Sequence, residues 1–441
     1  MNNKLLVPLE CVKKENGLVT YYQSDKVVMI PKTYEEKSVE LRAAWIATVG
    51  HIDMPGCTDE VAFKQAYEKA LDEMKQYNMN AVFMQVRPMN DAFYESKLNP
   101  YSRYLCGGVD GFVEGKKPSF DVMNYLIDEA KKRGMEFHAW LNPYRVSSTK
   151  RLSTLEMTLE EKKQLMKEDL DKLHPMNYAK QNPDTLLMSV DGQLIFDPGH
   201  PKAQTFILET IREIIDNYKV DGIHFDDYFY PSSGIDSDFS DKETYAKFGN
   251  GLLIEDFRRK SITTLIKNIK EMVDEHNNSG NRVIFGISPF GMWRHKKNDV
   301  RGSNSAGSEA YTTWYADLVE WVEHEYLHYI MPQLYWEFEH SVARYADLCD
   351  WWSNLMKDSN VLLYIGTPLS RFDSYKDTVD RNSAPNMLKY AQKDGVVKGH
   401  VIWHNKKLYA TDNEELVESQ KILKEMWAHP VAMPKYPFET K

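Results

Sequence analysis

The sequence predicts an α/β protein, a (β/α)8 TIM barrel with long loops between each strand and the helix that follows it. Eight apolar runs of strand length alternate with eight amphipathic stretches along the 441 residues. Such alternation builds a parallel sheet, and eight units close it into a barrel. A doubly wound open sheet is the alternative, but the chain after the first predicted strand lacks the glycine-rich phosphate loop typical of that fold.

The predicted elements cover most of the chain. The expected strands are Leu41–Val49, Asn80–Pro88, Met135–Tyr144, Val220–Tyr230, Arg282–Phe290, Leu327–Trp336, Val361–Leu369 and Val396–His404. The expected helices are Asp59–Tyr77, Asp121–Arg133, Pro201–Tyr218, Leu252–His276, Thr313–Glu325, Val342–Lys357, Met387–Lys393 and Glu415–Trp427. We therefore divide the chain into a lead-in segment (1–40), one barrel (41–428) and a C-terminal tail (429–441).

Loop lengths point to the functional face. The connections from a helix to the next strand are short, and two of them are the single residues Gly134 and Lys219. The connections from a strand to its helix are long, above all residues 145–200, which carry a helix of their own that begins with the capping pair Thr158 and Glu161. In a TIM barrel these long loops share the face that holds the active site.

The segment from Val220 to Pro231 contains the strongest candidate residues. Strand side chains alternate, so Ile223 and Phe225 face the helices, whereas His224 and Asp226 point into the barrel. Asp227 follows where the strand ends. Two adjacent carboxylates are costly to bury without partners, which indicates a catalytic or substrate-binding role. The alternative, a cap for the next helix, fits less well because that helix begins much later.

The same alternation brings other polar and aromatic residues to the strand ends. They are Arg87, His138, Trp140, Asn142, Gln333, Tyr335, Glu337 and Trp403. Each has a packing alternative, since a histidine in a barrel strand is more often a hydrogen-bonded core residue than a ligand, and a tryptophan there is as often core. Their convergence on one face is harder to explain by packing and predicts a binding cleft.

The composition narrows the classes of function. The formal net charge of −10 argues against nucleic acid or an anionic membrane surface as partner. No apolar run reaches the roughly 18 residues of a membrane-spanning helix. The 10 Trp and 26 Tyr residues are typical of an enzyme that lines a sugar-binding cleft with a few of them.

The cysteines and the N-terminus carry little information. Cys11, Cys57, Cys106 and Cys349 are widely spaced, without a CxxC pair, and we expect four free thiols. The apolar patch within Met1–Leu9 is too short for a signal peptide. The chain is therefore cytoplasmic, or it is a secreted or periplasmic protein given without its signal.

Metal chemistry has weak support in the sequence. There is no HExxH motif, no nucleophile elbow and no P-loop. His138, His224 and Asp226 are the one conceivable ligand set, which leaves a metal-dependent hydrolase as a minor alternative. We expect no metal and no cofactor.

At this point a family resemblance emerges from motifs in order between about residues 40 and 340. They are Arg42-Ala-Ala-Trp-Ile46 with Asp53, Gln85-Val-Arg-Pro88 with Asp91-Ala-Phe-Tyr94, His138-Ala-Trp-Leu-Asn-Pro-Tyr-Arg145, Asp197-Pro-Gly199, Asp221–Pro231, Gly286–Gly291 and Pro332–Trp336. The set resembles bacterial glycosyl hydrolase-like proteins related in fold to family-ten glycoside hydrolases. The resemblance implies a TIM barrel that cleaves glycosidic bonds in bacterial cell-wall glycan or another polysaccharide.

The sequence departs from these patterns in places. Asp53 is followed by Met54 where the family usually has Trp, and Glu337 stands where a small polar residue is usual. Family-ten enzymes proper carry a glutamate acid on strand four and a glutamate nucleophile on strand seven. Here strand four ends in Asp226 and Asp227, and strand seven has no Glu, so that machinery does not transfer.

Glycoside hydrolysis needs two carboxyl groups, one of them protonated. We expect Asp226 to be one, with Asp227 or Glu337 as its partner, acting on an oligosaccharide or polysaccharide. The substrate-binding candidates are Asp53, Arg87, Asp91, His138, Trp140, Asn142, Tyr144, Arg145, Asp197, His224, Tyr228, Gln333, Tyr335, Trp336 and Trp403. A carbohydrate-binding barrel without catalysis remains the alternative.

Overall fold

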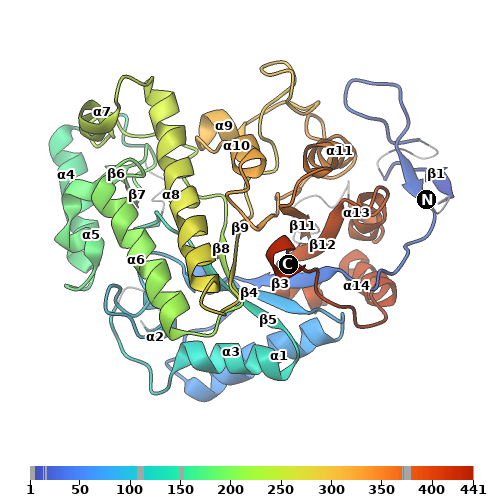
Figure 1. The fold of residues 1–441 in the computed structure, drawn as a ribbon, viewed down its shortest axis with the longest axis horizontal. Helices are drawn as coiled ribbons and strands as arrows, with labels where there is room; N and C mark the ends of the chain where they lie inside the picture. Colours follow the sequence, from blue (N-terminus) through green and yellow to red (C-terminus); the bar gives the residue numbers. More distant parts are fainter. Residues whose placement is uncertain are drawn as a thin grey trace.

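The computed structural model describes residues 5–12, 14, 17–106, 114–148, 153–369, 371 and 379–440. Its centre is a closed barrel of eight parallel strands, which confirms the predicted fold (Figure 1). The strands are β3 (Leu41–Ile46), β4 (Ala81–Arg87), β5 (Glu136–Leu141), β8 (Gly222–Phe225), β9 (Ile284–Ile287), β10 (Tyr329–Ile330), β11 (Leu362–Pro368) and β12 (Val397–Trp403). They pair in that order, and β12 pairs with β3 to close the barrel.

Helices surround the barrel between successive strands. They are α1 (Glu60–Lys75), α3 (Val122–Lys132), α6 (Pro201–Asn217), α8 (Ile254–Asn277), α10 (Leu318–Glu323), α11 (Tyr345–Met356), α13 (Ser383–Ala391) and α14 (Glu414–Met426). Further helices lie in the loops: α2 (Arg103–Cys106), α4 (Leu159–Lys172), α5 (Tyr178–Gln181), α7 (Lys242–Phe248) and α9 (Ala310–Thr313).

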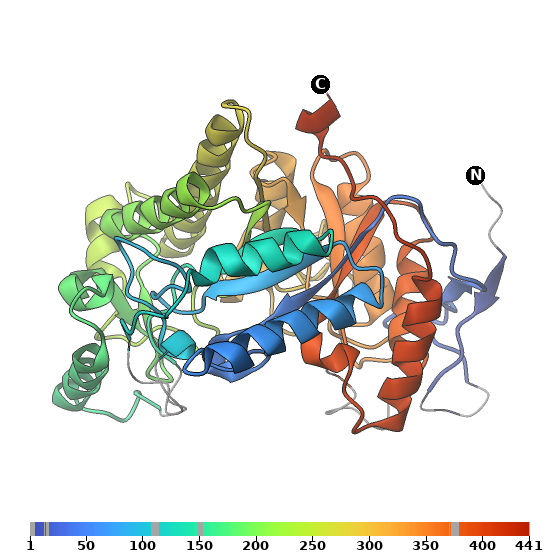
Figure 2. The same cartoon turned by 90° about the horizontal axis from the view of Figure 1, so that it is seen from below.

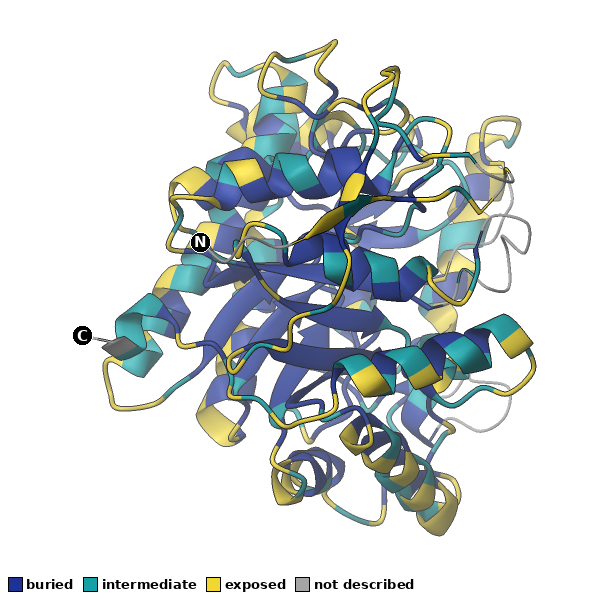
Figure 3. Cartoon of the chain, turned by 90° about the vertical axis from the view of Figure 1, so that its right-hand side faces the viewer, coloured by how far each residue is buried: buried dark blue, intermediate teal, exposed yellow. Residues whose placement is uncertain are grey.

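The hydrophobic core has two parts. The larger lies between the strands and the helices and contains outward-facing strand residues such as Ile223 and Phe225. The smaller fills the barrel interior around Trp45, Phe83 and Tyr329. Figure 3 shows the barrel strands almost wholly buried, whereas the surrounding helices carry exposed residues on one side. The alternation of inward and outward residues that the sequence predicted is therefore present.

All eight barrel strands are shorter than expected, β8 and β10 most of all, and these two end where the chain builds the mouth of the barrel. β10 stops after Ile330 because Pro332 has no N–H to donate, although its carbonyl still accepts from Gly366 N at 3.0 Å. β8 stops at Phe225, and the chain then turns so that Tyr228 N donates to Asp226 Oδ1 at 3.4 Å. Because β8 ends at Phe225, Asp226 and Asp227 lie beyond the sheet.

The connection between β5 and α6 is the largest loop insertion. It carries α4, α5 and an antiparallel hairpin of β6 (Leu186–Met188) and β7 (Leu194–Phe196), which the sequence had not indicated. Figure 2 places this insertion at one end of the molecule and the N-terminal pair β1 (Leu6–Pro8) and β2 (Met29–Pro31) at the other.

Residues near the C-terminus cover the lower end of the barrel, which is the amino end of its strands, opposite the mouth. Tyr436 is buried in the interior cluster, and its hydroxyl lies 2.8 Å from that of Tyr364. Arg282 pairs with Glu439 at 2.7 Å and with Glu136, the first residue of β5, at 3.0 Å. The residues after 430 therefore cover the amino end of the barrel, opposite the carboxyl end of the strands.

One expectation about the cysteines is wrong. Cys57 and Cys106 form a disulfide, with their Cα atoms 5.2 Å apart and the two residues 49 positions apart in sequence. Cys57 lies in the loop after β3 and Cys106 at the end of α2, after β4, and loops that follow neighbouring strands lie side by side. Cys11 and Cys349 are free thiols, as expected. In the described part of the chain, no helix is both long and apolar enough to cross a membrane.

Candidate active site at the carboxyl end of the barrel

Asp226 lies directly after β8, buried at the base of the barrel mouth. Its Oδ2 accepts hydrogen bonds from Asn142 Nδ2 at 2.6 Å and from Trp140 Nε1 at 3.2 Å. Burial raises the pKa of Asp226, but the positive charge of Arg145 and these donors oppose that rise. The donors favour the ionised form of this carboxyl, because a carboxylate only accepts hydrogen bonds.

Asp227 is placed to hold a proton. Burial, together with the negative charge of Asp226, raises its pKa to about 7, and a hydrogen bond from Gln333 opposes the rise only in part. Two carboxyls that interact this strongly titrate as a pair, and the pair retains one proton near neutral pH. Asp226, which receives hydrogen bonds from Asn142 and Trp140, takes the charge, and Asp227 takes the proton.

Arg145 connects the carboxyl pair to the loop after β5. Its guanidinium lies 4.2 Å from the ring centre of Tyr228 and donates weakly to Pro88 O at 3.4 Å. Tyr228 is half exposed, and the charge of Asp227 raises its pKa to about 12, so its hydroxyl remains protonated. Arg145 and Tyr228 thus line the cavity beside the carboxyl pair, and they supply one positive charge and one phenol hydroxyl there.

An inner cavity of about 250 Å³ lies over Asp226 and Asp227. Its walls are aromatic: Tyr335 stacks on Trp403 with ring centres 6.4 Å apart, and Trp140 and Trp45 meet Trp403 edge-on at 6.1 and 6.0 Å. Amphipathic rings of this kind pack against the C–H faces of a sugar and leave its hydroxyls to polar groups.

Gln85 also lines the inner cavity and supports Asn142, the residue that donates to Asp226. Gln85 accepts from the backbone N–H groups of Thr48 and Val49 at 2.9 and 2.8 Å, and its amide donates to Asn142 Oδ1 at 2.6 Å. Gln85 and Trp45 both stand in the quoted motifs but were not among the candidate site residues. Their inward positions on β4 and β3 follow from the alternation.

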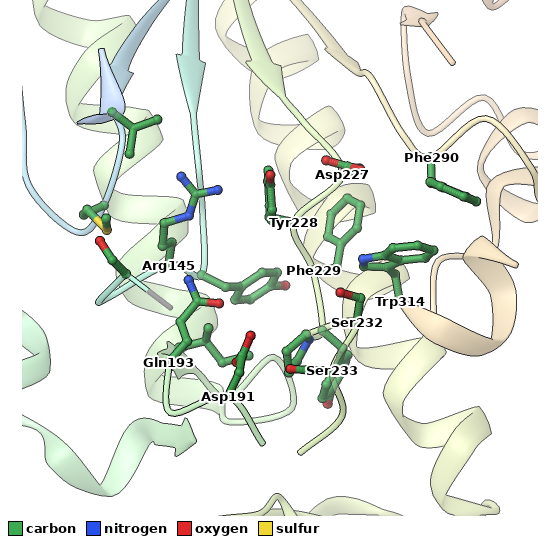
Figure 4. A pocket seen from close by; sticks show the side chains of 17 residues that line it. Arg145, Asp191, Gln193, Asp227, Tyr228, Phe229, Ser232, Ser233, Phe290 and Trp314 are labelled. Carbon is green, nitrogen blue, oxygen red and sulfur yellow. The ribbon is translucent and has the colours of Figure 1, made fainter. Parts of the chain in front are cut away.

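An outer cavity of about 470 Å³ adjoins the inner one (Figure 4). The two share Val49, Arg145, Asp227 and Tyr228 in their linings. The outer cavity is also lined by Tyr144, a predicted site residue, and by several residues that were not among the site candidates. These are Asp191, Gln193, Ser232, Ser233, Phe290 and Trp314.

The two predicted histidines lie deeper than the cavities. His224 bonds with Tyr329 Oη at 2.9 Å and Ser288 Oγ at 3.0 Å, and burial holds its pKa well below the usual range, so it is neutral. His138 Nε2 lies 3.2 Å from Glu136 at the lower end of β5. Both point into the barrel, as the alternation predicted, but neither lines the two cavities of the mouth.

Glu337 is separated from the Asp226 pair. It lines a third cavity together with Glu10, Cys11 and residues of α13 instead of facing the aromatic pocket. Trp336, next to it, meets Phe290 edge-on at 5.2 Å and thus supports the outer cavity from behind. Of the two expected partners for Asp226, only Asp227 shares a cavity with it.

Four other candidates are buried around the mouth, three in loops and Arg87 at the end of β4. Asp53 accepts from Ala47 N at 2.8 Å and contacts His404 Nδ1 at 2.6 Å. Asp91 accepts from Ser102 Oγ at 2.8 Å, and Arg87 donates to Asn142 O at 2.8 Å. Asp197 accepts from Thr244 Oγ1 at 2.5 Å. The bonds of Asp53 to His404, Arg87 to Asn142 and Asp197 to Thr244 join separate segments, whereas those to Ala47 and Ser102 lie within one loop, so these residues hold the shape of the mouth.

The side chains proposed as a possible metal-ligand set do not come together. Among the described residues, no three His, Cys, Asp or Glu side chains lie close enough together to hold a metal ion. His138 turns toward Glu136 at the lower end of the barrel, away from Asp226 at the mouth.

A family model described as glycosyl hydrolase-like 10 matches residues 40–381. The chain belongs to this family. It is 35% identical to the glycosyl hydrolase YngK of Bacillus subtilis (strain 168) over 407 residues, which cover 90% of this chain and 74% of YngK. The family and its named members support glycoside hydrolase activity for the chain.

Two further similarities agree with the family. The glycosyl hydrolase DigH of Escherichia coli (strain K12) is 36% identical over 346 residues, or 76% of this chain and 74% of DigH. The glycoside hydrolase domain of PgaB (BpsB) from Bordetella bronchiseptica superposes with a TM-score of 0.52 at 12% identity, covering 90% of this chain and all of that domain. At this identity the likeness shows the barrel fold alone.

Proposed function

We propose that this member of the glycosyl hydrolase-like 10 family cleaves a bacterial polysaccharide or cell-wall glycan, with Asp226 and Asp227 as its catalytic carboxyl groups. The observation that carries the proposal is their unequal environment in one aromatic-walled cavity. Asp226 receives hydrogen bonds from Asn142 and Trp140, whereas burial and its neighbour raise the pKa of Asp227 to about 7. Glycoside hydrolysis requires such an ionised and protonated pair.

The roles follow from the proton positions. Asp227 carries the proton and donates it to the glycosidic oxygen of the departing sugar. Asp226 stays ionised and faces the positive charge that develops at the anomeric carbon, as a nucleophile or as an electrostatic stabiliser. Tyr335, Trp140 and Trp403 support the sugar ring, and Arg145 holds its hydroxyls or the charge of the pair.

A panel of polysaccharides tests this proposal, with glycan strands from peptidoglycan stripped of its peptides among them. We expect the parent protein to release reducing ends from at least one polymer, and Asp226→Asn to lose at least about 10²-fold in rate. Glu160→Gln, at an exposed position on α4, is the matched carboxyl-to-amide control. Full activity in Asp226→Asn contradicts the assignment. Binding of a glycan with no cleavage favours the carbohydrate-binding alternative.

A further inference from the structure

The outer cavity is a separate feature that the carboxyl chemistry does not require. Asp227, Arg145 and Tyr228 line both cavities, so a bond cleaved at Asp227 lies at the junction between two spaces. A sugar ring in the inner cavity would direct the next ring of the chain into the outer one.

The walls of the outer cavity differ in chemistry. In Figure 4, Asp191, Gln193 and Arg145 lie on one side and Phe290 with Trp314 on the other. Phe290 and Trp314 pack with ring centres 4.4 Å apart and an interplanar angle of 31°. One wall therefore offers an apolar surface for a ring face, and the opposite wall offers hydrogen-bonding groups for a ring edge.

The polar wall is firmly held, although it stands on a hairpin outside the barrel. On one side of the hairpin, Phe196 N donates to Tyr144 O at 2.8 Å, and Gln193 Nε2 donates to Ser147 O at 2.9 Å. On the other side, Val190 N donates to Gly234 O at 3.0 Å. The hairpin is thus hydrogen-bonded both to the loop after β5 and to the loop after β8.

The tip of the hairpin is shaped by its sequence. Gly192 adopts a φ of 78°, which favours glycine, and this turn places Asp191 and Gln193 on either side of it. Ser189 Oγ donates to Asp191 Oδ1 and accepts from Gln193 N at 2.8 Å. These bonds fix the carboxylate of Asp191 before any ligand arrives, which lowers the entropy cost of binding.

We propose that the outer cavity is a second sugar-binding subsite, in which Trp314 stacks on a pyranose ring of the glycan chain and Asp191 and Gln193 accept hydrogen bonds from the donors on its edge. The inference rests on the proposed function, because it places the cleaved bond at Asp227. It makes the preferred substrate a glycan of at least two rings and makes the β6–β7 hairpin a determinant of specificity.

The test compares two substrates of different length. One is a tetrasaccharide of peptide-free peptidoglycan strands, which fills both cavities. The other is the β-fluoride of N-acetylglucosamine, whose fluoride leaving group occupies no sugar subsite. The measured quantity is the ratio of kcat/KM for the tetrasaccharide to kcat/KM for the fluoride. A loss of stability or of catalytic geometry lowers both terms, whereas loss of a subsite lowers the ratio.

We expect Trp314→Ala to lower this ratio about tenfold and Trp314→Phe to restore part of it. Asp191→Asn should lower it about three- to tenfold, while Glu160→Gln on the same insertion keeps the parent ratio. A ratio in Trp314→Ala and Asp191→Asn within about twofold of the parent overturns the proposal. Parallel loss on both substrates also overturns it.

A binding measurement separates this inference from the proposed function. In the Asp227→Asn background, calorimetry with the tetrasaccharide should show a Kd about tenfold weaker when Trp314→Ala is added. An unchanged Kd overturns the subsite even if cleavage is established. Continued cleavage by Asp226→Asn overturns the catalytic assignment instead, whatever Trp314 does.

Discussion

The side-chain amide of Asn142 donates a 2.6 Å hydrogen bond to Asp226 and accepts one of 2.6 Å from Gln85. Asn142 follows β5, Gln85 belongs to β4 and Asp226 follows β8, so three neighbouring strands determine the direction of one carboxylate. The orientation of Asp226 is therefore set chiefly at the ends of the barrel strands, with one further hydrogen bond from Tyr228 N in the loop after β8.

This relationship predicts the effect of Asn142→Ala. Loss of the donor destabilises the ionised form of Asp226, raises its pKa and lowers kcat about 10- to 100-fold. The acid limb of the pH–rate profile should move to higher pH, because Asp226 must be ionised to act. A variant that loses activity with an unmoved acid limb would show that Asn142 acts only through structure.

The alkaline limb reports on Asp227. The pKa of about 7 means that the proton is present below that pH and lost above it, so kcat/KM should fall tenfold per pH unit well above pH 7. Asp227→Asn should lower kcat about 10²- to 10⁴-fold and remove that limb. A profile that is flat to pH 9 in the parent protein contradicts a role for Asp227 as the acid.

The same carboxyl predicts a stability difference. Its folded pKa of about 7 exceeds the ordinary value of 3.8, so the folded state binds a proton more tightly than the unfolded state. Ionised Asp227 thus costs stability above pH 7, and that cost disappears as pH falls toward 4. Asp227→Asn should raise Tm by about 2–4 °C at pH 8 and have little effect at pH 4. Calorimetric scans at both pH values measure this.

The disulfide gives an independent prediction. Cys57 and Cys106 close a loop of 49 residues, and a cross-link of this length typically contributes about 2–4 kcal/mol. The double variant Cys57→Ser, Cys106→Ser should lose stability of that order in urea unfolding. Dithiothreitol should destabilise the parent protein but not the double variant. A reductant effect of equal size in both would show that another group responds.

The barrel could be predicted from the sequence because its signals are periodic. Inward and outward positions alternate along each strand, and Asp226, Trp140, Asn142 and Trp403 lie where this alternation placed them. Alternation gives the side of a strand but not the height in the barrel, which the stagger between strands determines. His224 and His138 consequently point inward, as predicted, yet lie below the cavities.

The outer cavity could not be predicted in this way. Its residues Asp191, Gln193 and Trp314 come from loop insertions, which have no repeating pattern. One local signal was present: Asp191-Gly192 stands between the apolar runs at 186–188 and 194–196, which is typical of a hairpin turn. The disulfide was missed for a related reason, since the two cysteines meet only because their loops follow neighbouring strands.

The buried position of Tyr436 has a practical consequence. Its contact with Tyr364, and the pairing of Arg282 with Glu439, place the residues after 430 in the barrel floor. A shortened expression variant ending at residue 428 would admit water to the side of the interior cluster opposite the active site. Such a variant would lose activity because it unfolds. In a series of deletions, that loss could be mistaken for a catalytic role of the last residues, although their role is in stability.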